Sequence, residues 1–367
     1  MFDRRFVQYF DWGLLGLTVL LGFLGIVTLY SVVSAGAQTP ESLLYIKQLI
    51  WFCTGLVVMV LSFVLNYKIL DRWAHTIYST CTLLLIAVLF FGKYVSGSKR
   101  WLMMGPLSVQ PSELIKIAVI IILAHYYSRH AYTRGFTLRE LIKPAVLVFI
   151  PFLLIVRQPD LGTAFLVFLI AGSMTMFVKI EKRAFISILG FCTVIVTLFW
   201  FFLKKYQKLR ILTFLNPDRD PLGAGYHIIQ SKIAIGSGAL TGKGYLEGTQ
   251  NALSFLPEQH TDFIFSVFAE EWGFVGSLIL ILAFLILIIW ALNIAYSCRD
   301  PFGTILSVGI SAMIFWQVVV NIGMVMGLMP VVGIPLPFIS YGGSSIVTMM
   351  ISIGLLMNVS MRRFMLE

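Results

Sequence analysis

Apolar stretches of membrane-spanning length recur along the whole chain and constrain its fold more than any other feature. A bilayer requires about 20 apolar residues per helix; several stretches reach this length, and the flanks of three shorter ones can extend them. Only 12% of the residues are charged, whereas a soluble globular protein has about a quarter. We predict ten membrane-spanning helices, at 14–33, 46–65, 75–91, 115–127, 145–156, 161–178, 185–203, 263–290, 305–328 and 346–359.

These spans predict an all-α integral membrane protein with a single polytopic domain over residues 1–367. The first span is too long, and too closely followed by others, for a cleaved signal peptide. Residues 204–262 form a long loop between spans seven and eight. The apolar but proline-rich segment 327–345 is predicted to be broken and partly re-entrant before span ten, because non-helical backbone at membrane depth must be buried or line a cavity.

Lysine and arginine in the short loops predict the orientation. Their positions fall on one side of the membrane if both termini are cytoplasmic: Arg4, Arg5, Lys68, Arg72, Arg129, Arg134, Arg139, Lys143, Lys179, Lys182, Arg183, Arg299, Arg362 and Arg363. The long loop then lies outside although it is also basic, since long loops translocate regardless of charge. Basic residues on the outer face favour an anionic ligand or lipid headgroup there, although solubility explains some of them equally well.

Several classes of site lack their signatures in this sequence. The four cysteines have no CxxC pairing, so we interpret them as packing residues without disulfide or metal roles. The histidines lack HExxH or other ligand spacing, and no Walker loop indicates ATP. We predict no nucleic-acid partner.

Two outer segments carry polar residues at the start of a span. Ser112 is a candidate N-cap, with Glu113 in the first helical turn. Glu113 and Lys116 are three residues apart and so share a helix face, which predicts a local ion pair. Asp160, which follows Pro159, is a natural N-cap for span six.

Glycines punctuate the later part of the long loop, at Gly236, Gly238, Gly242, Gly244 and Gly248. Such a series can bring backbone close to a ligand. No strand–glycine–helix context supports a nucleotide site, so the signal alone is weak.

Asp262, in the stretch FLPEQHTDFIFSV, precedes an apolar run long enough to enter the membrane. One interpretation places it at the N-terminus of the eighth helix, stabilised by the helix dipole. The other makes it a general base that faces a water-filled cavity, because interfacial ionisable residues are functional candidates. For Glu270 and Glu271 we predict structural pairing with a neighbouring helix, since buried acids must be paired or protonated.

Five motifs follow one another among the spans: SKRWLMMGPLSVQPSELIK, RQPDLGT, GAGYHIIQSKIAIGSGALTGKG, LPEQHTDFIFSVFAEEWGFVG and PVVGIPLPFISYGGSS. Together they resemble the SEDS family, the shape, elongation, division and sporulation proteins. The resemblance covers nearly the whole chain. The stretch GYLEGTQ before FLPEQHTDF resembles the rod-shape branch more than the division branch.

The resemblance implies a peptidoglycan glycosyltransferase of the bacterial cytoplasmic membrane that acts in cell elongation. It polymerises lipid II, the undecaprenyl-pyrophosphate disaccharide-pentapeptide, at the outer leaflet. Asp262 corresponds to the family aspartate, which we interpret as the general base on the acceptor 4-hydroxyl. The candidate substrate-binding residues are Lys47, Arg100, Gln110, Glu113, Lys116, Lys232, Glu258, His260, Thr261, Ser340 and Tyr341.

The leaving pyrophosphate requires Lys and Arg side chains or a divalent cation such as Mg²⁺ or Mn²⁺. The sequence identifies no certain cofactor. A lipid II flippase or related transporter is the alternative from another class, because many spans with a broken helix suit alternating access. The concentration of motifs on one face argues against it. A division-type member is the alternative within the family.

Nothing in the chain resembles a peptide cross-linking domain. The resemblance therefore implies a class B penicillin-binding protein and other elongation-complex membrane proteins as partners. Small residues such as Gly309, Ser311 and Gly323 would permit close approach of a partner helix, although packing inside the bundle explains them as well.

Overall fold

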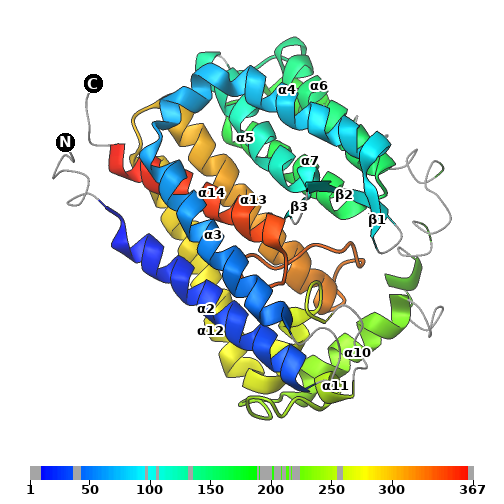
Figure 1. Cartoon of the computed structure of the whole chain (residues 1–367). Helices are drawn as coiled ribbons and strands as arrows, with labels where there is room; N and C mark the ends of the chain where they lie inside the picture. Colours follow the sequence, from blue (N-terminus) through cyan, green and yellow to red (C-terminus); the bar gives the residue numbers. More distant parts are fainter. Residues whose placement is uncertain are drawn as a thin grey trace.

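The computed structural model describes residues 10–35, 43–95, 98–104, 107–130, 135–187, 190, 201, 208, 212–214, 216, 224–253 and 259–362. Within these ranges, long helices pack side by side, and one small sheet lies at an end of the bundle (Figure 1). Nine of the ten predicted spans are helices here. The remaining one, 185–203, lies mostly outside the described residues.

The first six spans are α2 (Trp12–Ala35), α3 (Leu44–Val64), α4 (Tyr67–Phe91), α5 (Pro111–Arg129), α6 (Leu138–Arg157) and α7 (Leu161–Phe177). Two short helices follow in the long loop, α10 (Ala224–Ser237) and α11 (Thr249–Ala252). The last three spans are α12 (Ile264–Ser297), α13 (Pro301–Val325) and α14 (Gly343–Arg362). Among the described residues, six of these helices are long and apolar enough to cross a membrane, namely α2, α3, α4, α12, α13 and α14. The chain is a multi-pass membrane protein.

A three-stranded antiparallel sheet joins α4 to α5, in the order β1 (Lys93–Val95), β2 (Ser98–Met104) and β3 (Leu107–Val109). Strand β2 pairs with β3 in the register Leu102↔Val109 and Met104↔Leu107. The sequence analysis did not predict this sheet, although the Gly-Pro dipeptide at positions 105 and 106 is a turn signal. Since α4 also contacts β2, the sheet is attached to the end of the bundle.

Helix α5 lies at the centre of the bundle and packs against α4, α6, α7, α13 and α14. Its apolar run Ile117–Ala124 is buried on every side. A helix that is apolar all round belongs in the core of a large bundle. This central position explains how the first two turns of α5 can hold Glu113 and Lys116 away from solvent.

Helix α13 is also mostly buried, which corrects one expectation about partner contacts. A Cβ at Gly309 would lie 2.5 Å from Ile120 and 2.9 Å from Met174, so the glycine permits packing within the bundle. Ser311 and Gly323 are buried as well. These small residues do not lie on a lipid-facing surface.

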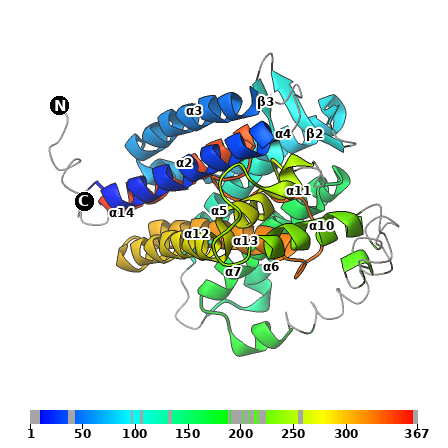
Figure 2. The same cartoon turned by 90° about the horizontal axis from the view of Figure 1, so that it is seen from below.

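The start of α2 and the end of α14 lie at one end of the bundle, and the sheet, α10 and α11 lie at the other (Figures 1 and 2). The segments expected on the outer side therefore gather at a single end.

Candidate active site

Asp262 lies on a short non-helical segment that leads into α12. The helix begins at Ile264 with Phe263 as its N-cap, so Asp262 lies one residue before the cap position. Its side chain is partly buried. The Oδ2 atom faces the backbone of Gly333, where an added Cβ would approach it to 3.2 Å. The carboxylate therefore lies against the proline-rich segment 327–345.

Asn321 of α13 fixes the backbone at Asp262. This asparagine is fully buried. Its Nδ2 atom donates to the carbonyl of Asp262 at 3.0 Å and to the carbonyl of Ile334 at 2.7 Å. One side chain thus joins α13, the segment before α12 and the proline-rich segment.

Ser340 and Tyr341 hold the two residues that precede Asp262. The Ser340 hydroxyl donates to the Thr261 carbonyl at 2.6 Å, and the Tyr341 N–H donates to the His260 carbonyl at 2.9 Å. The rings of His260 and Tyr341 lie 6.1 Å apart. Ser340 is buried, so its contacts support the Asp262 segment from within the protein.

Gln48 connects helix α3 to the same segment. Its Nε2 atom donates to the Ser340 carbonyl at 3.0 Å, and its Oε1 atom accepts from the Gly342 N–H at 3.3 Å. Lys47, the neighbouring residue, is exposed at this end of α3.

A second polar group, the ion pair of Glu113 and Lys116, lies in the first two turns of α5. The Lys116 Nζ atom donates to both carboxylate oxygens of Glu113 at 2.9 Å, as the spacing of three residues predicted. Both side chains are buried, with 1% of Lys116 and 4% of Glu113 exposed. Burial makes such a pair costly to break.

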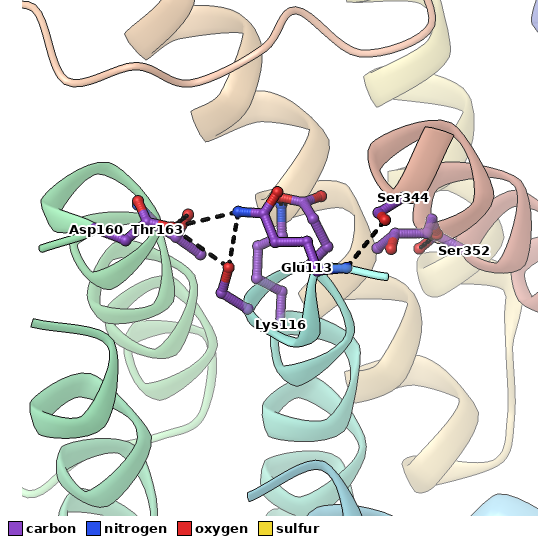
Figure 3. Close-up of polar contacts among 9 residues, drawn as sticks. Glu113, Lys116, Asp160, Thr163, Ser344 and Ser352 are labelled. Atoms are coloured by element: carbon purple, nitrogen blue, oxygen red, sulfur yellow. Dashed lines mark hydrogen bonds and ion pairs between the residues drawn. The ribbon is translucent and has the colours of Figure 1, made fainter. Parts of the chain in front are cut away.

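Asp160 is the N-cap of α7, as predicted, and accepts from the N–H of Thr163 at 3.3 Å and from its hydroxyl at 2.9 Å. Its carboxylate also accepts from Ser112 at 3.3 Å and from Gln110 at 3.4 Å (Figure 3). Ser112 is not the N-cap of α5, because the helix begins at Pro111 and Gln110 occupies the cap position. Its hydroxyl instead connects α5 to α7.

Arg100 attaches the sheet to this group. Its guanidinium lies 3.7 Å from Asp160 and donates to the carbonyl of Pro159. The side chain remains partly exposed, with 28% accessible. Arg100 therefore combines an internal ion pair with access to the surface.

Ser344, in the first turn of α14, connects the polar residues at the start of α5 with the segment that carries Asp262. Its hydroxyl accepts from the Gln110 N–H at 3.1 Å (Figure 3). Four residues earlier, Ser340 holds the segment that carries Asp262. Four extended residues span at most about 14 Å, so α5 and the Asp262 segment are held at neighbouring points of one short stretch.

Two further residues were predicted to bind substrate, Lys232 and Glu258. Lys232 is exposed on α10, and an added Cβ at Gly327 would lie 2.8 Å from its Nζ atom. It therefore lies beside the start of the proline-rich segment. Glu258 lies outside the described residues.

Helix α12 is broken eleven residues after Asp262, at Gly273, whose φ of 65° and ψ of −162° are not helical. The carbonyls of Glu270 and Glu271 therefore lack their usual helical donors. The N–H groups of Lys243 and Gly244 in the long loop donate to them at 3.0 and 3.1 Å.

The same loop also satisfies the other side of the break. The N–H of Phe274 donates to the carbonyl of Ala239 at 2.9 Å, and the N–H of Val275 donates to that of Leu240 at 3.1 Å. Four backbone hydrogen bonds thus connect the loop to the helix. They satisfy buried backbone groups that the break would otherwise leave unpaired.

The glycines of the loop permit its backbone to approach α12 closely enough for these hydrogen bonds. An added Cβ at Gly242 would lie 2.0 Å from the Glu271 carbonyl oxygen, and one at Gly238 would lie 2.1 Å from the Ala269 oxygen. Gly238 and Gly242 therefore bring the loop backbone close to α12.

Glu270 and Glu271 both have structural partners. The Oε1 atom of Glu270 accepts from Lys243 Nζ at 2.6 Å, from the Thr249 hydroxyl at 3.1 Å and from the Gln250 N–H at 3.1 Å. Glu271 accepts from the hydroxyl of Ser31 on α2. The partner of Glu271 lies on a neighbouring helix, as predicted, whereas these partners of Glu270 belong to the long loop and its helix α11.

Among the described residues, no group of three or more His, Cys, Asp or Glu side chains is arranged to hold a metal ion. Mg²⁺ is usually held by one or two carboxylates plus substrate phosphates. A divalent ion near Asp262 would therefore depend mainly on oxygens of the substrate.

Asn321 and Gln48 position the Asp262 segment, and neither was predicted from the sequence. Both are amide side chains inside apolar helices. Polar residues within membrane spans are candidates for functional contacts, and this signal would have identified both of them.

Comparisons with known proteins agree with the motifs. The family model of the cell cycle proteins FtsW, RodA and SpoVE matches residues 9–364. Peptidoglycan glycosyltransferase MrdB of Escherichia coli (strain K12) is 42% identical over 95% of this chain and 94% of its own. Peptidoglycan glycosyltransferase RodA of Treponema pallidum is 36% identical over 98% of this chain and 99% of its own.

A solved structure has the same fold over nearly the whole chain. It belongs to work on the coordination of polymerization and crosslinking by a peptidoglycan synthase complex. The match has a TM-score of 0.82 and 31% sequence identity, and it covers 97% of this chain and 99% of that one. The family model, the relatives and the fold agree with the resemblance that the motifs predicted, and the chain belongs to the FtsW/RodA/SpoVE family.

Proposed function

We propose that this chain is a peptidoglycan glycosyltransferase that polymerises lipid II during cell elongation. Both termini lie in the cytoplasm, and the Asp262 site faces the outer leaflet. The observation that carries the proposal is the fixed position of Asp262: hydrogen bonds from Asn321, Ser340 and Tyr341 hold its segment at the end of the bundle where the family motifs gather. The relatives named peptidoglycan glycosyltransferases support the reaction class.

Asp262 acts as the general base. A sugar hydroxyl is a poor nucleophile, so its attack requires a base within hydrogen-bond reach. The acceptor 4-hydroxyl oxygen bonds to the anomeric carbon of the donor, and its proton passes to the carboxylate. The bond from this carbon to the pyrophosphate breaks, and lipid pyrophosphate leaves with the electron pair. One base and one displacement invert the anomeric centre, unlike the two-carboxylate retaining mechanism.

Basic side chains stabilise the charge of the leaving pyrophosphate. Lys47, Lys232 and Arg100 are exposed or partly exposed at this end, and we assign them to the pyrophosphate. Lys116 is enclosed with Glu113, so we assign this pair to support of the site.

Asp262→Asn should abolish polymerisation of fluorescent lipid II by purified protein in detergent, because an amide cannot accept the proton. Glycan strands are resolved by gel electrophoresis. Asp300→Asn is the matched control, since Asp300 caps α13 and asparagine is an equally good cap. Near-normal turnover by Asp262→Asn would disprove the general-base role. Long strands made without a membrane gradient would also exclude the transporter alternative.

A class B penicillin-binding protein is the proposed partner, because glycan strands alone do not form a cross-linked wall. The similarity to a chain from a peptidoglycan synthase complex supports this assignment. Co-expression should yield a stable one-to-one complex with faster polymerisation of lipid II than the chain alone. Failure to copurify in mild detergent, together with equal activity, would refute it.

A further inference from the structure

A cavity of about 510 Å³ lies beside the C-terminal end of α7 and has no part in the proposed function. Its volume falls within the range of about 300–1,000 Å³ that is typical of ligand sites. Its lining residues come from the end of α7 and the segment that follows: Met176, Phe177, Val178, Lys179, Ile180, Lys182, Phe185 and Ile186.

The cavity lies far from the catalytic end. Helix α7 begins beside Asp160, which is linked to the sheet through Arg100. Its 17 residues place its other end about 25 Å away at 1.5 Å per residue. In the proposed orientation this end meets the cytoplasmic leaflet.

The cavity combines an apolar surface with cationic groups. Met176, Phe177, Phe185 and Ile186 are all large and exposed. Lys179 and Lys182 line the same cavity. An amphiphilic anion matches this combination, because its chains would cover the apolar side chains and its charge would meet the ammonium groups.

The charge of the segment is positive even when its acid is counted. Lys179, Lys182 and Arg183 surround a single acidic residue, Glu181. The cytoplasmic leaflet carries anionic lipids, and basic pockets between membrane helices on that side bind their headgroups.

The backbone of the segment is held in place by the loop before α6. Ile180 forms a parallel bridge with Phe136. The N–H of Phe136 donates to the Lys179 carbonyl at 2.9 Å, and the N–H of Glu181 donates to the Phe136 carbonyl at 3.1 Å. The two lysines are therefore presented from a fixed turn, which reduces the ordering cost of binding.

We propose that this cavity binds an anionic phospholipid of the cytoplasmic leaflet. Its phosphate contacts Lys179 and Lys182, and its acyl chain packs on Phe177 and Ile186. This site is independent of lipid II polymerisation, so its failure and that of the proposed function are distinguishable.

Native mass spectrometry of the full chain in detergent tests the site. Dioleoyl-phosphatidylglycerol is titrated against dioleoyl-phosphatidylcholine, which has the same chains but no net charge. The wild type should retain phosphatidylglycerol preferentially. Lys179→Gln/Lys182→Gln should weaken this retention about fivefold for each lysine, because each ammonium attracts the anionic headgroup.

Lys68→Gln/Arg72→Gln is the matched control, because both residues are exposed on α4 and lie on the same predicted side. It should leave phosphatidylglycerol retention unchanged. Ile186→Trp, which fills the apolar part of the cavity, should lower retention as well. Inorganic phosphate should not compete. Equal retention of both lipids by the wild type, an equal loss in the control pair or competition by free phosphate would overturn the proposal.

Discussion

Within the part of the chain that the structure describes, two lysine–glutamate ion pairs have a buried carboxylate, and they are built in different ways. Glu113 and Lys116 belong to a single turn of α5, and both carboxylate oxygens accept from the one ammonium. Glu270 and Lys243 come from α12 and the long loop, and the glutamate also accepts from Thr249 and Gln250. The first pair depends on a single partner, whereas the second is one contact of a network.

The two pairs show two ways in which a membrane bundle can compensate a buried carboxylate, by one cation or by several hydrogen-bond donors. Within the described residues, the carboxylate of Glu113 and the ammonium of Lys116 form hydrogen bonds only with each other. Removal of one member would leave the other uncompensated. Glu270 would keep a hydroxyl and an N–H donor after loss of its lysine, and the lysine is itself 26% exposed. The two pairs should therefore respond very differently to equivalent substitutions.

Lys116→Met should have the largest effect, a loss of about 3–5 kcal/mol in the free energy of unfolding, because it leaves a buried carboxylate without its partner. Denaturant titration in detergent measures this loss. Polymerisation should fall with it, since α5 holds Gln110 and its contact with Ser344. Lys68→Met, at an exposed position, is the control and should change stability by less than about 0.5 kcal/mol.

The double variant Glu113→Gln/Lys116→Met separates the destabilisation caused by an unpaired buried charge from that caused by altered packing. Replacement of both charged groups should restore much of the lost stability, because no buried charge remains unpaired. If the double variant is as unstable as Lys116→Met, the pair stabilises α5 through something other than charge compensation.

The sequence predicted the first pair and not the second, for a physical reason. Glu113 and Lys116 are three residues apart, and helical periodicity alone places them on one face. Asp160 as a cap is equally local. Lys243 and Glu270 are separated by a glycine-rich loop, and no local pattern specifies where such a loop returns.

The break in α12 was missed because composition cannot reveal it. The apolar run 263–290 predicts one continuous helix, and a single glycine inside it is normally tolerated. Only the contact with the loop explains Gly273, since the break and the loop satisfy each other's backbone groups. The sheet before α5 and the hydrogen bonds of Asn321 to Asp262 and Ile334 likewise depend on contacts that no local pattern specifies. The site was therefore predictable as a set of motifs, and its geometry was not.

Gly273→Ala should have an intermediate effect, a loss of about 2–3 kcal/mol in the free energy of unfolding, because its backbone conformation is essentially confined to glycine. An added Cβ would also lie 2.2 Å from the Gly242 nitrogen. Gly172→Ala is the control, since nothing lies within 4 Å of its added Cβ, and it should be neutral. A Gly273→Ala variant as stable as the wild type would show that the loop and the broken helix do not depend on each other.

Lys243→Met should have the smallest effect, although it also removes the cation from a fully buried glutamate. The Oε1 atom of Glu270 retains the Thr249 hydroxyl and the Gln250 N–H, and solvent already screens the partly exposed ammonium. We expect a loss of about 1 kcal/mol, measured by the same titration, with polymerisation largely preserved. Lys243→Met/Thr249→Ala should lose more than the sum of the single variants, because the remaining donors compensate for one another. A loss from Lys243→Met alone that equals the loss from Lys116→Met would contradict the contrast between the two pairs, since Glu270 would then depend on its lysine as fully as Glu113 does.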